Sequence, residues 1–283
     1  MTWHASLKLD YALAKQKHAQ NAPKTVAYFE HNGPLRILQS LYPEGDAVCH
    51  NVVVHPPGGL VGGDTLNIDI TVAPGAHALI TTPGATRFYR SDGAPALQAV
   101  HAKLQDGARL EWLPLEALAY SGCIAQNRSC FELASTAEMM AWDVTALGLP
   151  QANLPFERGS FSQHIELPGH WLERARIDAA DTVLMDGPLG LAGHRCLGTL
   201  FFATGSSVSR TRREAALETA RAVIAAHPLQ GNAGVTAPNP HVIVLRVLAP
   251  LVEPAMGLLR QVWNVWRQQL WGLQAGTPRI WSV

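Results

Sequence analysis

Hydrophobic and polar residues alternate with a period of two along much of the chain. Residues 66–72 place Leu, Ile, Ile and Val at every second position, and residues 7–13 repeat the pattern less regularly. Successive side chains of a β-strand point to opposite faces, so this period predicts strands with one buried face. We expect residues 1–205 to be rich in such strands.

Short turn sequences separate these segments. Pro74-Gly75 follows residues 66–72 and precedes residues 76–82, while Asp106-Gly107 lies between two further strand-like segments. Both turns predict β-hairpins. The two regions also align at an offset of 32 residues. That alignment indicates either stacked, repeated β-layers or only the turn chemistry that hairpins share.

Two later segments have helical spacing instead. Apolar residues recur every three or four positions in residues 211–227, which follow Ser209 as a helix cap. The same spacing occurs in residues 254–271, with Gly272 just beyond the end. We therefore predict helices at about 211–227 and 254–271.

The chain contains no low-complexity linker that would mark a domain boundary. Residues 228–240 are rich in Pro, Gly and Asn and are typical of a loop. We expect one domain over residues 1–283. Its predicted fold is mainly β, with two helices in the C-terminal third.

Composition narrows the function classes. Of 283 residues, 47% are hydrophobic and only 16% are charged, whereas about 25% is usual for a soluble domain. The 22 Lys and Arg balance the 22 Asp and Glu. A general nucleic-acid binder or a polybasic membrane-surface protein needs a basic excess, so we expect neither partner.

The cysteines and the first residues bear on location. Cys49, Cys123, Cys130 and Cys196 form no C-x-x-C pair, and unpatterned cysteines suit a reducing cytosol. No basic stretch followed by an apolar core opens the chain. We expect a cytoplasmic protein.

The glycine-rich segment HPPGGLVGGD, residues 55–64, invites a phosphate-loop interpretation. A phosphate loop needs Lys and Ser or Thr after its last glycine and then a helix, but here Asp64 follows and a strand comes next. Four glycines suit a tight turn with positive φ angles. The segment is either purely structural or a turn that presents Asp64 and His55 to a ligand.

The sequence gives little evidence for an enzyme active site. The sequence has no G-x-S-x-G elbow and no H-E-x-x-H, and His164-Ile165-Glu166 lacks the P-C-x-x-C half of a zinc-deaminase signature. The acidic residues are more informative. Five of them stand inside or beside apolar, strand-like segments, where charges are usually paired or functional unless they face solvent: Asp64, Glu111, Glu116, Asp143 and Glu173.

Tryptophan is concentrated near the C-terminus. Trp263 and Trp266 share one face of the last predicted helix, beside Arg267. Trp and Arg often anchor interfaces, although a Trp stripe at helical spacing is also typical of a core. We expect Trp263, Trp266 and Arg267 to bind a partner, with the core as the alternative.

Five segments in order resemble the signature segments of the urease accessory protein UreD family, called UreH in some organisms. They are HPPGGLVGGD at 55–64, TTPGATRFYRS at 81–91, LEWLPLEAL at 110–118, WDVTALGLP at 142–150 and PRIWSV at 278–283. The chain departs from the family pattern at Pro83, Leu115, Leu149 and Leu273, where the family usually has Gln, Gln, Arg and Arg. These departures bear on partner contacts and on the lining of any passage.

The resemblance implies a non-catalytic chaperone with a β-helix-like, multi-layer fold. It implies binding to apo-urease and, together with UreF and the GTPase UreG, support of nickel insertion. It also implies a passage for transient Ni²⁺ without a tightly bound cofactor. A passage favours oxygen ligands that bind weakly and in series. By motif position, Asp64, Asp143 and Glu173 are the residues that the resemblance assigns to it.

Two other functions stay open at this stage. Stacked β-layers also carry carbohydrate-active enzymes that use paired carboxylates, although no closely spaced acid pair is present. A nickel store is the other, but the sequence lacks His-rich tracts.

Overall fold

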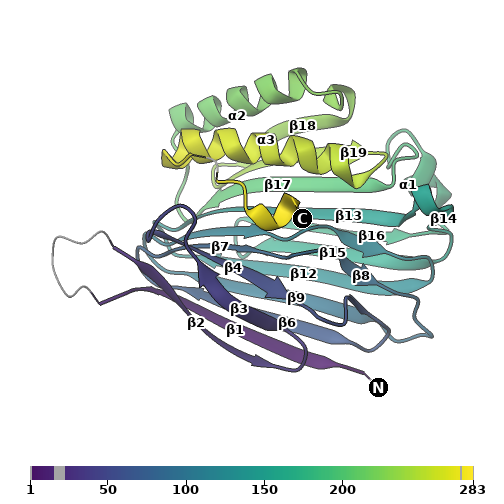
Figure 1. Ribbon diagram of the computed structural model, residues 1–283. Helices are drawn as coiled ribbons and strands as arrows, with labels where there is room; N and C mark the ends of the chain where they lie inside the picture. Colours follow the sequence, from purple (N-terminus) through teal and green to yellow (C-terminus); the bar gives the residue numbers. More distant parts are fainter. Residues whose placement is uncertain (1, 16–22, 275, 283) are drawn as a thin grey trace.

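Two β-sheets face each other in this protein. The computed structural model describes residues 2–15, 23–274 and 276–282. In these residues the chain forms a β-solenoid of about four turns with helices near its C-terminal end (Figure 1). The predicted mainly β, β-helix-like architecture is confirmed.

Sheet A has seven strands within the described residues. In spatial order they are β16 (Trp171–Asp178), β15 (Gly159–Leu167), β12 (Cys123–Leu133), β9 (Ala96–Leu104), β6 (Thr65–Val72), β1 (His4–Leu13) and β2 (Thr25–Asn32). The strands from β15 to β1 pair in parallel, and the two edge strands, β16 and β2, pair antiparallel to their neighbours.

Sheet B lies opposite. Its main path over the described residues is β18 (Ala233–Asn239), β19 (Val242–Ala249), β17 (Cys196–Thr204), β13 (Glu138–Leu149), β10 (Arg109–Leu113), β7 (His77–Thr81), β4 (Val48–Val54) and β3 (Arg36–Leu41). Four short strands lie off this path: β5 (Gly59–Leu60), β8 (Thr86–Phe88), β11 (Ala117–Ala119) and β14 (Leu154–Pro155).

The two predicted hairpins are wrong, and the 32-residue repeat is correct. β6 and β7 belong to different sheets, so Pro74-Gly75 is a corner at which the chain crosses from sheet A to sheet B. Thr65 pairs with Leu97 in sheet A and His77 pairs with Arg109 in sheet B, both 32 residues apart. The Pro-Gly and Asp-Gly turns have the chemistry of a hairpin, but each strand pairs with the next turn of the solenoid.

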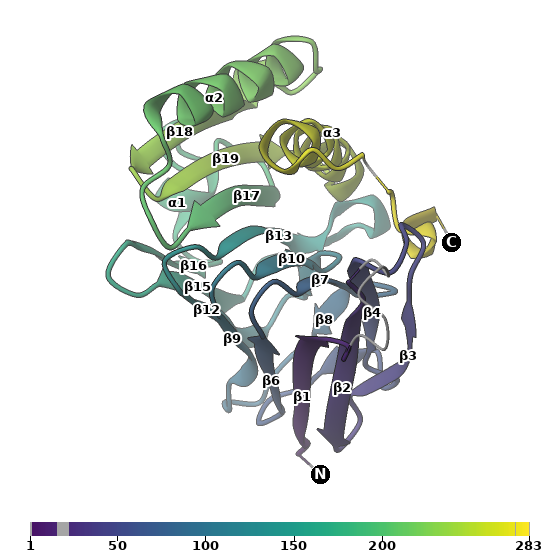
Figure 2. The same cartoon turned by 90° about the vertical axis from the view of Figure 1, so that its left-hand side faces the viewer.

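Helices cover the outer face of sheet B. α2 (Arg210–Ala225) and α3 (Val252–Trp271) pack against each other, outside β17 and β19 (Figure 2). The Ser209 side chain accepts a hydrogen bond from the Arg212 amide, and Gly272 has a φ of 67°, so both predicted helix boundaries at these residues are confirmed. A third helix, α1 (Thr182–Asp186), is too short to show a period in the sequence.

Short 3₁₀ segments complete the described secondary structure. They are η1 (Pro150–Ala152), η2 (Gln230–Asn232) and η3 (Arg279–Ser282). No helix in the described ranges is long and apolar enough to span a membrane.

The solenoid and the helices bury two separate apolar cores. One fills the space between sheets A and B, and the other lies between sheet B and the helices. Sheet B is therefore buried on both faces. Along β13, Met139 and Ala141 face the first core, while Met140 and Trp142 face the second. A strand buried on both faces has a nearly continuous apolar sequence, as β13 does.

Candidate functional site

A layer of polar side chains interrupts the apolar core between the two sheets. Gln98, Asn127 and Gln163 occupy paired positions on β9, β12 and β15, so they form one ladder across sheet A. The neighbouring inward positions on these strands are mostly apolar, for example Val100 and Phe161. Asn127 is buried, and Gln98 and Gln163 are half-buried. Because buried amides need hydrogen-bond partners, we look for the partners of this layer inside the solenoid.

Asp143 on β13 supplies those partners from the opposite sheet. The Asn127 amide donates to one carboxylate oxygen and the Gln163 amide donates to the other, each at 2.7 Å. The Thr145 hydroxyl adds a longer bond of 3.3 Å. Burial raises the pKa of Asp143 to about 6, against the lowering effect of Gln163 and Thr145, and the charge of Glu173 adds to the rise. The carboxyl group therefore takes up a proton more readily than an ordinary Asp.

The polar layer continues from Asn127 away from Asp143, toward β9 and β8. The Gln98 amide donates to the Asn127 carbonyl oxygen at 3.3 Å, and the Thr86 hydroxyl on β8 donates to the Gln98 carbonyl oxygen at 3.3 Å. Five residues thus form one hydrogen-bonded row through the solenoid. We call Thr86, Gln98, Asn127, Asp143 and Gln163 the internal polar row.

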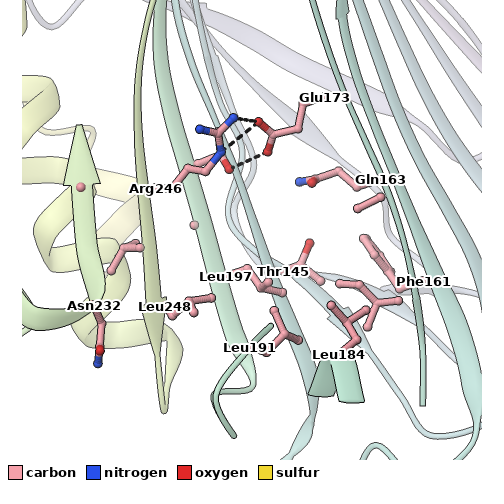
Figure 3. Close-up of a pocket in the computed structure, with 16 residues that line it drawn as sticks. Thr145, Phe161, Gln163, Glu173, Leu184, Leu191, Leu197, Asn232, Arg246 and Leu248 are labelled. Atoms are coloured by element: carbon pink, nitrogen blue, oxygen red, sulfur yellow. Dashed lines mark hydrogen bonds and ion pairs between the residues drawn. The ribbon is translucent and has the colours of Figure 1, made fainter. Parts of the chain in front are cut away.

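A cavity of about 470 Å³ lies at the Gln163 end of the row. Glu173 on β16 sits in its wall, paired with Arg246 on β19 and accepting a 3.3 Å hydrogen bond from the Thr199 hydroxyl (Figure 3). Leucine side chains line the other part of the cavity. Glu173 is partly exposed and Arg246 about half exposed, so this end of the row reaches the surface.

A second cavity, of about 230 Å³, lies at the other end. Thr86 and Gln98 line it together with His55, Arg87 and apolar residues of the core. The internal polar row therefore connects the two cavities, with Gln163 in the wall of one and Thr86 and Gln98 in the wall of the other.

The row offers oxygen ligands rather than a dedicated metal centre. Carbonyl, hydroxyl and carboxylate oxygens bind divalent cations, and they do so weakly when few converge on one point. Among the described residues no three or more His, Cys, Asp or Glu side chains are arranged to hold a metal ion. The arrangement suits passing contacts with a cation.

Asp64 does not belong to this row. It is 3% exposed, one carboxylate oxygen accepts the Trp3 amide at 2.7 Å, and the other accepts the Val61 amide at 2.9 Å. Of the two interpretations of the glycine segment, the structural one accounts for Asp64, because its carboxylate holds the loop closed. Of the three acids assigned to a passage, the structure brings together only Asp143 and Glu173.

A different set of charges ties α3 to sheet B. Glu111 on β10 accepts hydrogen bonds from the Arg267 guanidinium at 2.9 Å, from Trp263 at 2.7 Å and from His77 at 2.9 Å. Arg267 also binds Glu44. Burial alone would raise the pKa of Glu111, but His77 and Arg267 lower it to about 2. Glu111 is thus a paired, structural acid.

The expectation of an exposed partner-binding face on the last helix is corrected. Trp263, Trp266 and Arg267 are each 0% exposed. Trp263 packs against Trp142 and Trp281, while the Trp266 indole donates to the Ala216 carbonyl of α2. The alternative of a core stripe is the one observed, because both α2 and sheet B cover this face of α3.

Sequence reasoning missed Gln98, Asn127 and Gln163. Each is a neutral amide in an alternating strand, where the pattern alone does not say which face it occupies. The strand register would have revealed them, since Gln98 and Asn127 become neighbours once β9 is aligned with β12.

Fold and site together define a β-solenoid protein whose core carries a polar row between two cavities. Residues 4–282 match the family model described as UreD urease accessory protein. The chain belongs to the UreD family of urease accessory proteins.

Close relatives extend over the whole chain. It is 64% identical to a urease accessory protein UreD of Polaromonas sp. (strain JS666 / ATCC BAA-500), 66% to that of Paracidovorax citrulli and 56% to that of Leptothrix cholodnii. Each alignment covers 100% of both chains. The relatives carry the name of an accessory protein and not of an enzyme.

Proposed function

We propose that this chain supports urease maturation as a non-catalytic chaperone, and that its internal polar row conducts Ni²⁺ toward apo-urease. The observation that carries the proposal is the hydrogen-bonded row from Thr86 to Gln163, which connects two cavities through a largely apolar core. Membership of the UreD family supports the link to urease.

The chemistry of the row suits transfer. A cation that leaves water needs replacement ligands along its whole path, and conduction needs sites that release it again. Amide and hydroxyl oxygens provide such ligands without trapping the ion. Asp143 supplies negative charge within the row, next to Gln163, and Glu173 supplies it in the wall of the larger cavity.

Arg246 hinders the access of a cation to the larger cavity. Its guanidinium pairs with Glu173 in the isolated chain. Cation entry there requires the pair to separate, because the guanidinium repels Ni²⁺. A partner surface that binds Arg246 would free the Glu173 carboxylate, so we assign partner contact to this end of the row.

The partners in this proposal are apo-urease, UreF and, through UreF, the GTPase UreG, in the cytoplasm. The proposal includes no resident cofactor, since nickel is the cargo. Low charge and zero net charge suit a chain that works within a complex.

A deletion strain tests the function. Without this chain, urease polypeptides should be present at their normal level but contain little nickel and show little activity, and a plasmid copy of the chain should restore both. Normal nickel content and activity in the deletion strain would exclude the proposal. Turnover of a glycan by the purified chain would favour the carbohydrate-active alternative.

A further inference from the structure

His55 has an unexplained ring nitrogen. The residue directly follows β4, and its Nε2 atom is buried without a hydrogen-bond partner among the described residues. A buried polar atom of this kind usually faces an unseen water molecule or ion. His55 also lines the smaller cavity, into which the internal polar row opens.

The loop that carries His55 is firmly held. The Gly58 amide donates to the His55 carbonyl oxygen at 2.9 Å, and Gly58 has a φ of 76°, which favours glycine. Arg87 donates to the Gly58 carbonyl oxygen at 3.3 Å. The Asp64 carboxylate closes the other end of the loop through the Val61 amide. The glycine-rich segment therefore fixes the position of the imidazole at the cavity wall.

The smaller cavity contains the groups that a cation at this end of the internal polar row would meet. Thr86 and Gln98, the first two residues of the internal polar row, line it together with His55. Among the residues that the structure describes, Arg87 is the only cationic side chain in this lining. A single imidazole beside a guanidinium gives a weak site, because the guanidinium repels the bound cation.

We propose that His55 is the nitrogen ligand at the smaller-cavity end of the internal polar row and that it selects divalent transition-metal ions such as Ni²⁺ over Mg²⁺. The inference rests on the proposed function, since it treats the row as a cation path. Oxygen ligands alone suit Mg²⁺ and Ca²⁺, whereas imidazole suits Ni²⁺, Cu²⁺ and Zn²⁺. His55 is thus the residue of this path that discriminates between the two classes.

The protonation state of His55 agrees with this role. Burial lowers the pKa of His55, and the nearby Asp64 only partly offsets the effect. At neutral pH the imidazole is therefore uncharged. With its proton on Nδ1, it presents the Nε2 lone pair that a metal ion requires.

Direct binding tests the inference without urease activity. We would titrate the full chain with Ni²⁺ alone and with Mg²⁺ alone, comparing the original sequence with His55→Gln and with His31→Gln. His31 lies on the edge strand β2 and is exposed, so it serves as the matched control. We expect His55→Gln to lower Ni²⁺ affinity at least about tenfold and to leave Mg²⁺ affinity unchanged, while His31→Gln changes neither.

A second measurement does not depend on the variant folding. Paramagnetic Ni²⁺ should broaden the His55 imidazole resonances of the unmodified chain before those of His31. Unchanged Ni²⁺ affinity in folded His55→Gln, or no broadening at His55, would overturn the inference. If that result came with impaired nickel transfer by Asp143→Asn, the proposed path would stand and only the role of His55 would fall.

Discussion

The Glu111 carboxylate and the Arg267 guanidinium lie 2.9 Å apart inside the protein, although 156 residues separate them in the chain. Neither side chain is exposed. Their contact joins β10 of the solenoid to α3, so it fixes the helical layer on sheet B. Trp263, which donates to the same carboxylate, makes this joint specific to one orientation of the helix.

Arg267→Ala should destabilise the protein strongly. Removing the guanidinium leaves Glu111 buried with too few donors, which typically costs about 3–5 kcal/mol. Urea unfolding measures the loss. Arg210→Ala is the control, because Arg210 forms an exposed pair with Glu214 that water and salt screen, so its loss should change stability little. Equal effects of the two substitutions would contradict the assigned role of Arg267.

The contacts of Glu111 predict that the stability of the protein falls in acid. The pKa of Glu111 is lower in the folded chain, about 2, than its ordinary value of 4.5, so its stabilising contribution is complete above pH 4.5 and disappears as the pH falls toward 2. The stability difference between the original chain and Glu111→Gln should therefore shrink over this range. Thermal unfolding from pH 6 to pH 2.5 checks it, and a constant difference would count against the pairing.

For Asp143 we predict the opposite dependence of folding stability on pH. Its pKa rises on folding from 3.8 to about 6, so the folded state holds the proton more tightly and stability falls as the pH rises through this range. Asp143→Asn removes the ionisation. We expect it to stabilise the chain at pH 7 by up to about 3 kcal/mol and to have little effect near pH 4. Equal stability of the two proteins at both pH values would argue that Asp143 is not enclosed.

Asp64→Ala should act through folding. The substitution removes the carboxylate that accepts the part-buried hydrogen bonds from the Val61 and Trp3 amides, and a hydrogen bond to a charged group contributes about 1.5–3 kcal/mol to stability. Urease activation in cells should fall only in proportion to the soluble, folded protein, measured by quantitative immunoblot. If urease activation were lost although the variant is equally stable and present in a normal amount, Asp64 would instead act in nickel transfer.

The sequence predicts more of the fold than of the candidate site. The period-two strands and the 32-residue offset predicted stacked β-layers, because a solenoid repeats both its strand period and its corner chemistry. Pro74-Gly75 predicts a hairpin but forms a corner between the sheets, because turn residues specify a local reversal of the chain and not the partner of the next strand.

Of the residues at the site, the sequence reveals mainly the charged ones. Asp143 stands out in the apolar run of β13, but Gln98 and Asn127 do not, since neutral amides are common on solvent-facing strand positions. Their meeting depends on the parallel register of β9 and β12. The sequence does not distinguish a partner-binding role from a core role for Trp263 and Trp266 for a related reason. Helical spacing identifies an apolar face, but only the packing of α2 and sheet B shows that this face is covered.

The nickel content of urease assembled with Asp143→Asn tests the central claim most directly. Urease, this chain, UreF and UreG would be co-expressed, the complex isolated, and nickel per urease active site measured after activation. Asp69→Asn is the matched control, because it makes the same change on the exposed outer face of sheet A. We predict that Asp143→Asn forms the complex normally but leaves urease depleted of nickel, while Asp69→Asn loads it fully. Full nickel loading with Asp143→Asn would contradict conduction through the internal polar row.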